Sequence, residues 1–428
     1  MTATETENSI SAGNWRHRAE AIASIMVVAS LPCLVVGPVT FAVFGGIGIL
    51  LAAFLNGWEA NVEALRKFLR SPIGIAIIFT FAAWAPGTIM SLDVGESISV
   101  VIRMILFTVV GILLYDFLNN RPQLLRLQLK TIIIGLFFAY FLSTITMVFF
   151  PEVIAQIKGY DLMEKHYGKL FFKRYASASV LFAPLLVWGG LALGNRWRIM
   201  AFGIVLLLPG YFVLLESRSA IAGLLAAFLI FVLLIGFRYR NKMILIGLWS
   251  VVGLGIAGAL SYLAARYTSP PVPFDPILPP WLIDPHRQII WMNTINLAEV
   301  KPWFGWGINT ANFAINHIES FTIAKEYPPL PGHPHNWIVE VLAETGVFGV
   351  LSLMGTVLLS AFLILKKYLA NFQKGYLAVM SVFGGFWVSS LFNFSIWSAW
   401  WQMVFVVVST IILANSNFHN RNSETDGQ

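Results

Sequence analysis

The sequence contains few charged residues and only one cysteine. Charged residues make up 11% of the 428 positions, whereas 57% are hydrophobic. A typical soluble domain is about a quarter charged. No soluble core could bury this much apolar side chain, so a soluble globular fold is excluded and lipid must solvate most of the chain. The single cysteine, Cys33, excludes an intrachain disulfide and a metal site built from cysteines.

Acidic residues are also fewer than basic ones, at 21 against 28, which gives a formal charge of +7. The basic residues are scattered between apolar runs rather than gathered in one stripe, so a nucleic-acid partner is not indicated. Such an excess is typical of the cytoplasmic loops of membrane proteins. Residues 1–20 are polar, and we interpret them as a cytoplasmic tail before an uncleaved first span, because Pro32 and a second apolar run follow at once.

The apolar runs predict an all-α polytopic membrane protein with twelve transmembrane helices. Residues 21–55 would form one helix of roughly 50 Å, too long for a hydrocarbon core of about 30 Å, so Gly37-Pro38 is expected to divide them into two spans. The other predicted spans are residues 73–91, 99–118, 131–150, 177–194, 199–215, 220–237, 243–264, 346–365, 375–393 and 397–414. The predicted organisation is therefore a tail at 1–20, nine spans in 21–264, a large loop at 265–345, three spans in 346–414 and a tail at 415–428.

The loops then sort by charge, with the short basic loops on one side. The positive-inside rule places that side and both termini in the cytoplasm. The two long segments, residues 151–176 and 265–336, fall outside. Asp284-Pro285 predicts a helix over 285–299, with aspartate as N-cap and proline at the first position. The basic segment 151–176 is either a surface hairpin near lipid headgroups or a docking site for a phosphorylated acceptor.

Two places concentrate polar groups against the apolar trend. Arg218 lies in the turn Glu216–Ser219 between two spans. It is either an interfacial arginine that reaches lipid phosphates or part of an anion clamp. His335 and Asn336 precede a helical pattern, so the helix dipole is expected to keep His335 neutral and able to accept a proton.

Neighbouring residues suggest two further kinds of site, neither of which is favoured. His333 and His335 lack a third ligand, which disfavours a metal site, and Pro334 is expected to turn His333 elsewhere. Glu340 and Glu344 lie one turn apart on one helix, so they cannot flank a sugar as a glycosidase pair would. Glu340 is interpreted as neutralising the helix start.

These motifs resemble those of the O-antigen ligase and polymerase superfamily. The segment HPHNWIVEVLAETGVFG resembles the His-Asn…Glu-x-Gly-x-x-Gly signature of that family. SRSA at 217–220 resembles its Ser-Arg-x-Ala motif. Arg287 to Trp291, followed by KPWFGWGIN, resembles its Arg-x-x-x-Trp helix and glycine turn. Residues 200–400 carry the resemblance, and residues 1–200 share only the layout.

The resemblance implies an enzyme that moves a glycan from undecaprenyl pyrophosphate to a sugar hydroxyl. The transfer would invert the anomeric centre without metal or cofactor, on the periplasmic face of a bacterial inner membrane. Arg218 and Arg287 would hold the pyrophosphate and His335 would act as base. Asn336, Glu344 and Trp291 would contact substrate, as the two arginines would.

An O-antigen ligase acting on lipid A-core is the favoured activity. The first alternative is a polysaccharide polymerase of the same superfamily. Such polymerases often have glycine eleven residues after their periplasmic arginines, and neither Arg218 nor Arg287 does. The second alternative, a secondary transporter, is disfavoured because the predicted spans hold almost no charges near their middle.

Overall fold

The computed structural model describes residues 3–158, 167–239, 278–280, 282–314 and 332–416, with single positions between 243 and 261. Regular structure in the described residues is entirely helical, which confirms an all-α polytopic membrane protein. The helices are α1 (Ala3–Cys33), α2 (Pro38–Asn56), α3 (Trp58–Leu69), α4 (Pro72–Ile89), α5 (Val94–Asn119), η1 (Pro122–Leu124), α6 (Leu125–Phe149), α7 (Pro151–Lys158), α8 (Tyr167–Leu193), α9 (Asn195–Leu214), α10 (Arg218–Tyr239), α12 (Pro285–Val300), α13 (Ala311–Ala314), α14 (Trp337–Asn371), α15 (Lys374–Ser389) and α16 (Ala399–Ala414).

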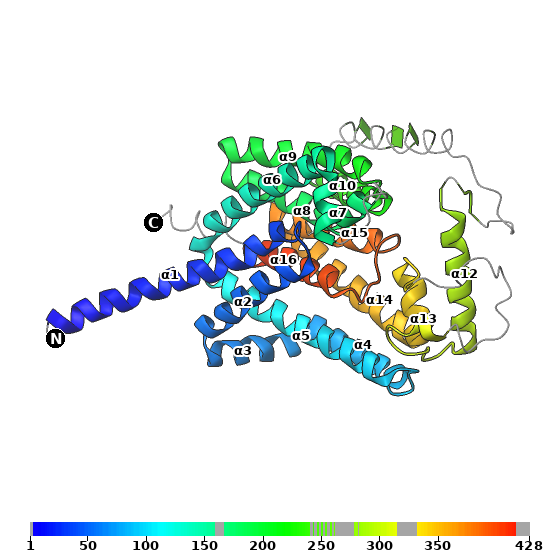
Figure 1. The fold of residues 1–428 in the computed structure, drawn as a ribbon. Helices are drawn as coiled ribbons and strands as arrows, with labels where there is room; N and C mark the ends of the chain where they lie inside the picture. The colour runs from blue at the N-terminus through cyan, green and yellow to red at the C-terminus, as the bar shows by residue number, and fades with distance from the viewer. Residues whose placement is uncertain are drawn as a thin grey trace.

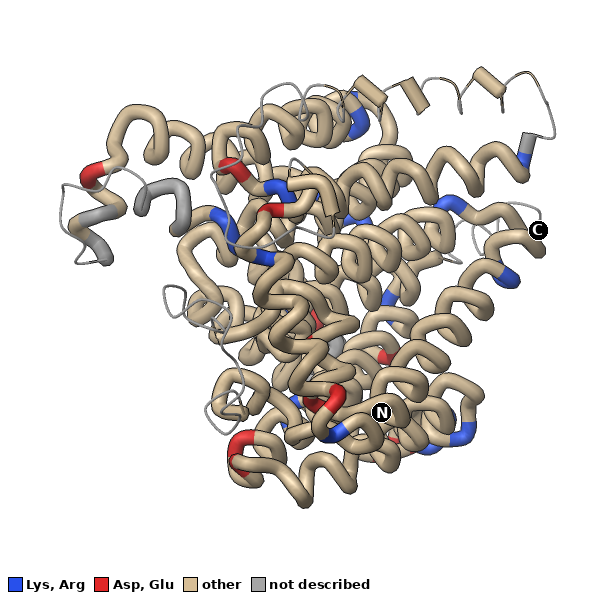
Figure 2. The backbone as a smooth tube through the Cα atoms, turned by 90° about the vertical axis from the view of Figure 1, so that its right-hand side faces the viewer, with Lys and Arg blue, Asp and Glu red and all other residues tan. Residues whose placement is uncertain are grey.

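Eight helical segments of the described residues are long and apolar enough to cross a membrane. They are α2, α4, α5, α6 together with η1, α8, α9, α10 and α14. Three further predicted spans coincide with α1, α15 and α16, while the predicted span 243–264 lies almost wholly outside the described residues. The total of twelve therefore stays a prediction. Figure 2 shows how rarely charged residues interrupt the tan tube.

Figure 1 shows the helices as a bundle with distinct ends. Helix α1 projects to the left, and α12 and α13 lie on the right beside the start of α14. The predicted break between the first two spans is confirmed, because Gly37 separates α1 from α2 and Pro38 begins α2. Close contacts between helices use small residues: a Cβ on Gly223 of α10 would lie 2.9 Å from the carbonyl oxygen of Gly385 on α15.

Two local differences from the prediction stand out. Residues 151–176 are not one loop, since α7 begins at Pro151 and α8 begins at Tyr167. Buried aromatic side chains, Phe172 and Tyr175 among them, extend α8 beyond its apolar span. The predicted span start at residue 346 coincides with a break in α14, which begins at Trp337 and has a non-helical φ of +67° at Gly346. The amphipathic helix α3 was not predicted. Its apolar and polar side chains alternate, so it has no long apolar run of the kind that marks a membrane span.

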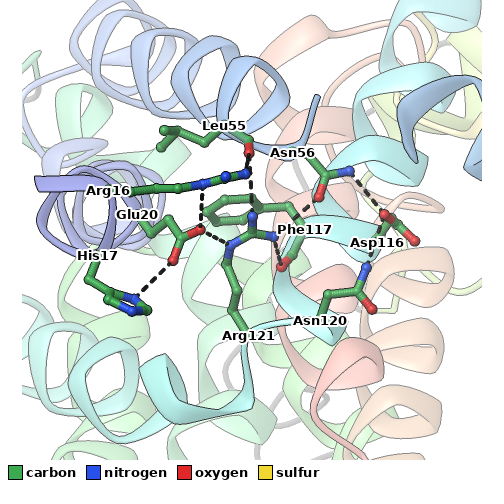
Figure 3. Close-up of polar contacts among 9 residues, drawn as sticks. All are labelled: Arg16, His17, Glu20, Leu55, Asn56, Asp116, Phe117, Asn120 and Arg121. Carbon is green, nitrogen blue, oxygen red and sulfur yellow. Dashed lines mark hydrogen bonds and ion pairs between the residues drawn. The ribbon is translucent and has the colours of Figure 1, made fainter. Parts of the chain in front are cut away.

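A network of polar residues joins α1, α2 and the end of α5 (Figure 3). Glu20 and Arg121 are both buried, with 2.9 Å between a carboxylate oxygen and the guanidinium Nε. Arg121 also donates to the Asn56 side chain at 3.1 Å and to the Phe117 carbonyl at 3.2 Å. With the Leu55 carbonyl at 3.5 Å, the buried cation thus has a carboxylate and three neutral acceptors, as a buried charge requires.

Candidate functional site

One cavity, of about 830 Å³, brings together residues that are far apart in the sequence. Its walls come from the turn between α1 and α2, the start of α8, the turn before α10, the start of α12 and the loop after α15. Arg218, Arg287 and His335, the three residues predicted to be catalytic, all line it. The structure therefore gathers these three side chains around one space.

Arg218 enters the cavity from the first position of α10. The preceding turn is tight, because Glu216 has a φ of +53° and the Ser217 amide donates to the Phe212 carbonyl at 2.9 Å. Ser217 and Ser219 are buried while Arg218 between them is exposed. The turn thus fixes the backbone and leaves the guanidinium available in the cavity.

Arg287 lies in the first turn of α12, and this helix confirms the prediction for 285–299. Asp284 is its N-cap, accepting from the His286 amide at 2.9 Å, and Pro285 is its first residue. The Arg287 Nη1 donates to the Phe392 carbonyl at 3.0 Å. Burial lowers the pKa of Arg287, Asp284 opposes this, and Arg218 lowers it further. The last effect places two cations near one another, which favours a bound anion between them.

His335 sits just before the N-cap Asn336 of α14, with a φ of +56°. Its Nδ1 lies 2.9 Å from the Asn393 carbonyl. A carbonyl can only accept, so Nδ1 carries the hydrogen and Nε2 keeps its lone pair. Burial is the main cause that lowers the pKa of His335, partly offset by this hydrogen bond. His335 is therefore neutral, as expected, but the main cause is desolvation rather than the helix dipole.

His333 lies against His335, so the expectation that Pro334 turns it elsewhere is wrong. The two rings meet edge to face with centroids 4.1 Å apart. Burial, then His335 and Arg287, lower the pKa of His333 to about 3. His333 is not among the residues that line the cavity. It is a neutral ring that supports one side of His335.

The loop after α15 holds this site together, and sequence analysis did not single it out. Consecutive carbonyls of Phe392 and Asn393 accept from Arg287 and from the His335 ring. The Asn393 side chain is fixed in turn, accepting from Ser177 Oγ at 3.0 Å. Main-chain carbonyls carry no residue signature, and the only available signal was an asparagine within an apolar run.

Glu344 does not line the cavity, and its contact with substrate stays a prediction. The side chain is 3% exposed and accepts from the Asn309 amide at 2.8 Å, from the Ala311 amide at 3.1 Å and from the Trp397 indole. Its carboxylate therefore anchors the turn before α13. Glu340 is likewise buried and accepts from a backbone amide, that of Ile396, at 3.0 Å. That bond joins α14 to the loop before α16. Glu340 was expected only to neutralise the start of the helix, so this contact is an additional role.

Two glycines allow the turn before α13 to approach the bend in α14. Gly305 has a φ of +70°, and a Cβ there would lie 2.3 Å from the Glu344 carbonyl carbon. Gly346 has a φ of +67°, and a Cβ there would lie 2.2 Å from the Trp303 backbone. Any larger residue at either position would separate the two segments.

Trp291 and Asn336 also shape the site without lining the cavity. The Trp291 indole donates to the Pro334 carbonyl at 2.9 Å, which holds the loop that carries both histidines. The Asn336 side chain accepts from the Ile338 amide at 3.1 Å and so begins α14. Within the described ranges, no group of three or more His, Cys, Asp or Glu side chains could hold a metal ion.

Comparison with known proteins bears on these residues directly. Residues 202–354 match the family model described as O-antigen ligase, and this stretch includes Arg218, Arg287 and His335. This part of the chain is therefore similar to the O-antigen ligase family. The superfamily predicted from the motifs is thereby confirmed.

Curated relatives of the chain come from several Rickettsia species. Proteins described as "Putative polysaccharide ligase" in Rickettsia felis and Rickettsia typhi are each 28% identical, over 118 and 119 residues. A Rickettsia prowazekii protein of the same description is 29% identical over 128 residues. Each match covers 27% of this chain and spans only 28% of the relative's length.

Proposed function

We propose that the protein is a glycosyltransferase of the O-antigen ligase type. It would transfer a polysaccharide from undecaprenyl pyrophosphate to a hydroxyl of the lipid A-core oligosaccharide, on the periplasmic face of a bacterial inner membrane. One observation carries the proposal: two arginines and a histidine with a free ring nitrogen line the same cavity. These are the groups that a transfer from a lipid pyrophosphate to an alcohol requires.

The arginines suit the leaving group. As the bond from the anomeric carbon to the pyrophosphate oxygen breaks, its electron pair stays on the pyrophosphate. Arg218 and Arg287 stabilise that charge, because a guanidinium binds phosphate oxygens in pairs. Pyrophosphate needs no proton in order to leave, so the site requires cations and no general acid.

His335 suits the acceptor. The sugar hydroxyl attacks the anomeric carbon on the face opposite the leaving group, and Nε2 of His335 takes its proton. The Asn393 carbonyl holds the Nδ1–H tautomer and stabilises the imidazolium that forms. A single displacement of this kind inverts the anomeric configuration.

Reconstitution tests the proposal. The purified protein in proteoliposomes would receive undecaprenyl-pyrophosphate-linked glycan and lipid A-core, and the products would be separated by mass. Glycan joined to lipid A-core is the expected product. Longer lipid-linked glycan would instead indicate a polymerase, and movement of unreacted substrate across the bilayer would indicate a transporter.

A further inference from the structure

Two more cations line the cavity and have no part in the mechanism above. Lys173 and Arg174 are adjacent residues near the start of α8, the first half-buried and the second exposed. Neither forms an ion pair with a carboxylate of the described residues. With Arg218 and Arg287 they make four cationic side chains on the cavity wall, against two carboxylates. Arg218 and Arg287 are assigned to the donor pyrophosphate, so Lys173 and Arg174 remain available for a second anion.

The loop after α15 shows where the second pair lies relative to the base. Its residue 392 holds Arg287 through the carbonyl, and residue 393 holds His335 in the same way. The ring of residue 394, Phe394, lies 6.0 Å from the guanidinium carbon of Arg174, within the range of a cation–π contact. The residue that holds His335 thus lies, along the loop, between the residue that contacts Arg287 and the residue that contacts Arg174.

The start of α8 is fixed to the same loop by hydrogen bonds. Ser177 Oγ donates to the Asn393 side chain at 3.0 Å and also lies 3.0 Å from the Lys173 carbonyl, one turn earlier. The pair at 173 and 174 therefore sits on a helical turn that is anchored to the residue that orients the base. Lys173 and Arg174 are therefore part of the ordered lining of the cavity.

We propose that Lys173 and Arg174 form a second anion subsite, which binds a phosphate carried by the acceptor glycan. This inference rests on the proposed function. An inverting displacement needs the attacking hydroxyl and the leaving pyrophosphate on opposite faces of the anomeric carbon. We assign one substrate to each cationic pair: Arg218 and Arg287 hold the donor, and Lys173 and Arg174 hold the acceptor, while the loop that contacts both pairs also orients His335. The enzyme then selects acceptors that bear a phosphate near the accepting hydroxyl.

The test compares KM for a phosphorylated acceptor with KM for the same acceptor after phosphatase treatment, in proteoliposomes of zwitterionic lipid. Wild type should favour the phosphorylated acceptor by about 10- to 100-fold, as expected for charged hydrogen bonds. In Lys173→Gln/Arg174→Gln that preference should fall toward one. The exposed pair Arg196 and Arg198 on α9 supplies the control, and its double Gln variant should keep the wild-type preference.

Further variants and lipids separate the possible outcomes. If the double variant does not fold, Arg174→Gln alone changes an exposed side chain and should still reduce the preference, while Arg174→Lys should retain most of it. An unchanged preference in these variants, or no preference in wild type, would overturn the subsite. An effect that appears only when phosphatidylglycerol is added would assign the pair to a lipid headgroup and overturn it too. If wild type transfers glycan to neither acceptor, the proposed function itself fails.

Discussion

The network of Glu20 and Arg121 and the cavity use charge in opposite ways. In the network of Figure 3, the Arg121 cation has a carboxylate partner, Glu20, and three neutral acceptors. In the cavity, four cations face two carboxylates, and neither Arg218 nor Arg287 has an ion-pair partner within the described part of the chain. The start of α2 lines the cavity and its last residue, Asn56, touches the network, so roughly 27 Å of helix separates the regions.

The charges of Glu20 and Arg121 stabilise the fold, whereas the cations of the cavity are suited to binding a ligand. A buried ion whose partner is another side chain stabilises the structure only while both are present. Cations that the protein leaves unneutralised in a cavity attract an anionic ligand instead. Changes in the first region should therefore affect stability and spare chemistry, and changes in the second should do the reverse.

The largest effect is expected at His335. His335→Ala should lower the transfer rate by about 10²- to 10⁴-fold, the usual loss when a general base is removed, with the unfolding temperature nearly unchanged. His333→Ala should be milder, because its ring supports His335 but does not line the cavity. Initial rates with equal amounts of folded protein measure both. A reversed ranking of the two histidines would contradict the assignment of the base.

Next in size is the effect of breaking the Glu20–Arg121 pair. Glu20→Gln leaves a buried arginine without its carboxylate, so it should destabilise the protein by about 3–5 kcal/mol. Glu63 is the matched control, because its ion pairs on α3 are largely exposed and should contribute no more than about 1 kcal/mol. Thermal unfolding in detergent gives both values. If Glu20→Gln unfolds as wild type does but transfers slowly, the division between the two regions is broken.

A smaller loss is expected when the cavity arginines become lysines. Arg218→Lys and Arg287→Lys keep the charge but lose the paired hydrogen bonds to phosphate, so each should reduce kcat/KM for donor by about 10- to 100-fold. At Arg287 the bond to the Phe392 carbonyl is also altered. Rates near wild type would mean that only the positive charge matters at these positions.

The smallest effect concerns pH. Burial holds the pKa of His335 below 6.5, and only the neutral ring can accept a proton. The transfer rate should therefore stay flat above about pH 6.5 and fall tenfold per unit once the pH drops below the pKa of His335. The residual rate of His335→Ala should show no such limb. If Glu344→Gln removes the limb while His335→Ala retains it, the base is Glu344.

Short-range signals allowed much of this to be predicted from the sequence. Asp284 and Pro285 predicted α12 because capping is local, and Gly37-Pro38 predicted the break before α2 for the same reason. Arg218, Arg287 and His335 stand out by chemical type and by motif. Their arrangement about one cavity could not be derived, because it depends on contacts between residues more than 50 positions apart.

The differences from prediction have the same origin. The role of Glu344 is decided by amides at 309 and 311 and by an indole at 397, none of which is its neighbour in the sequence. The early start of α8 is decided by aromatic burial against other helices. The loop at 392–394 contacts Arg287 and His335 through backbone carbonyls and Arg174 through one aromatic ring. No sequence motif predicts such contacts.

Donor binding and single-turnover transfer, measured on the same proteoliposomes, test the central claim most directly. The claim is that the cavity divides its work, with Arg218 and Arg287 holding pyrophosphate and His335 taking the proton. His335→Ala should bind undecaprenyl-pyrophosphate-linked glycan within about threefold of wild type and transfer almost none of it, whereas Arg287→Ala should lose both binding and transfer. Wild-type turnover by His335→Ala, or donor affinity unchanged in Arg287→Ala, would contradict it.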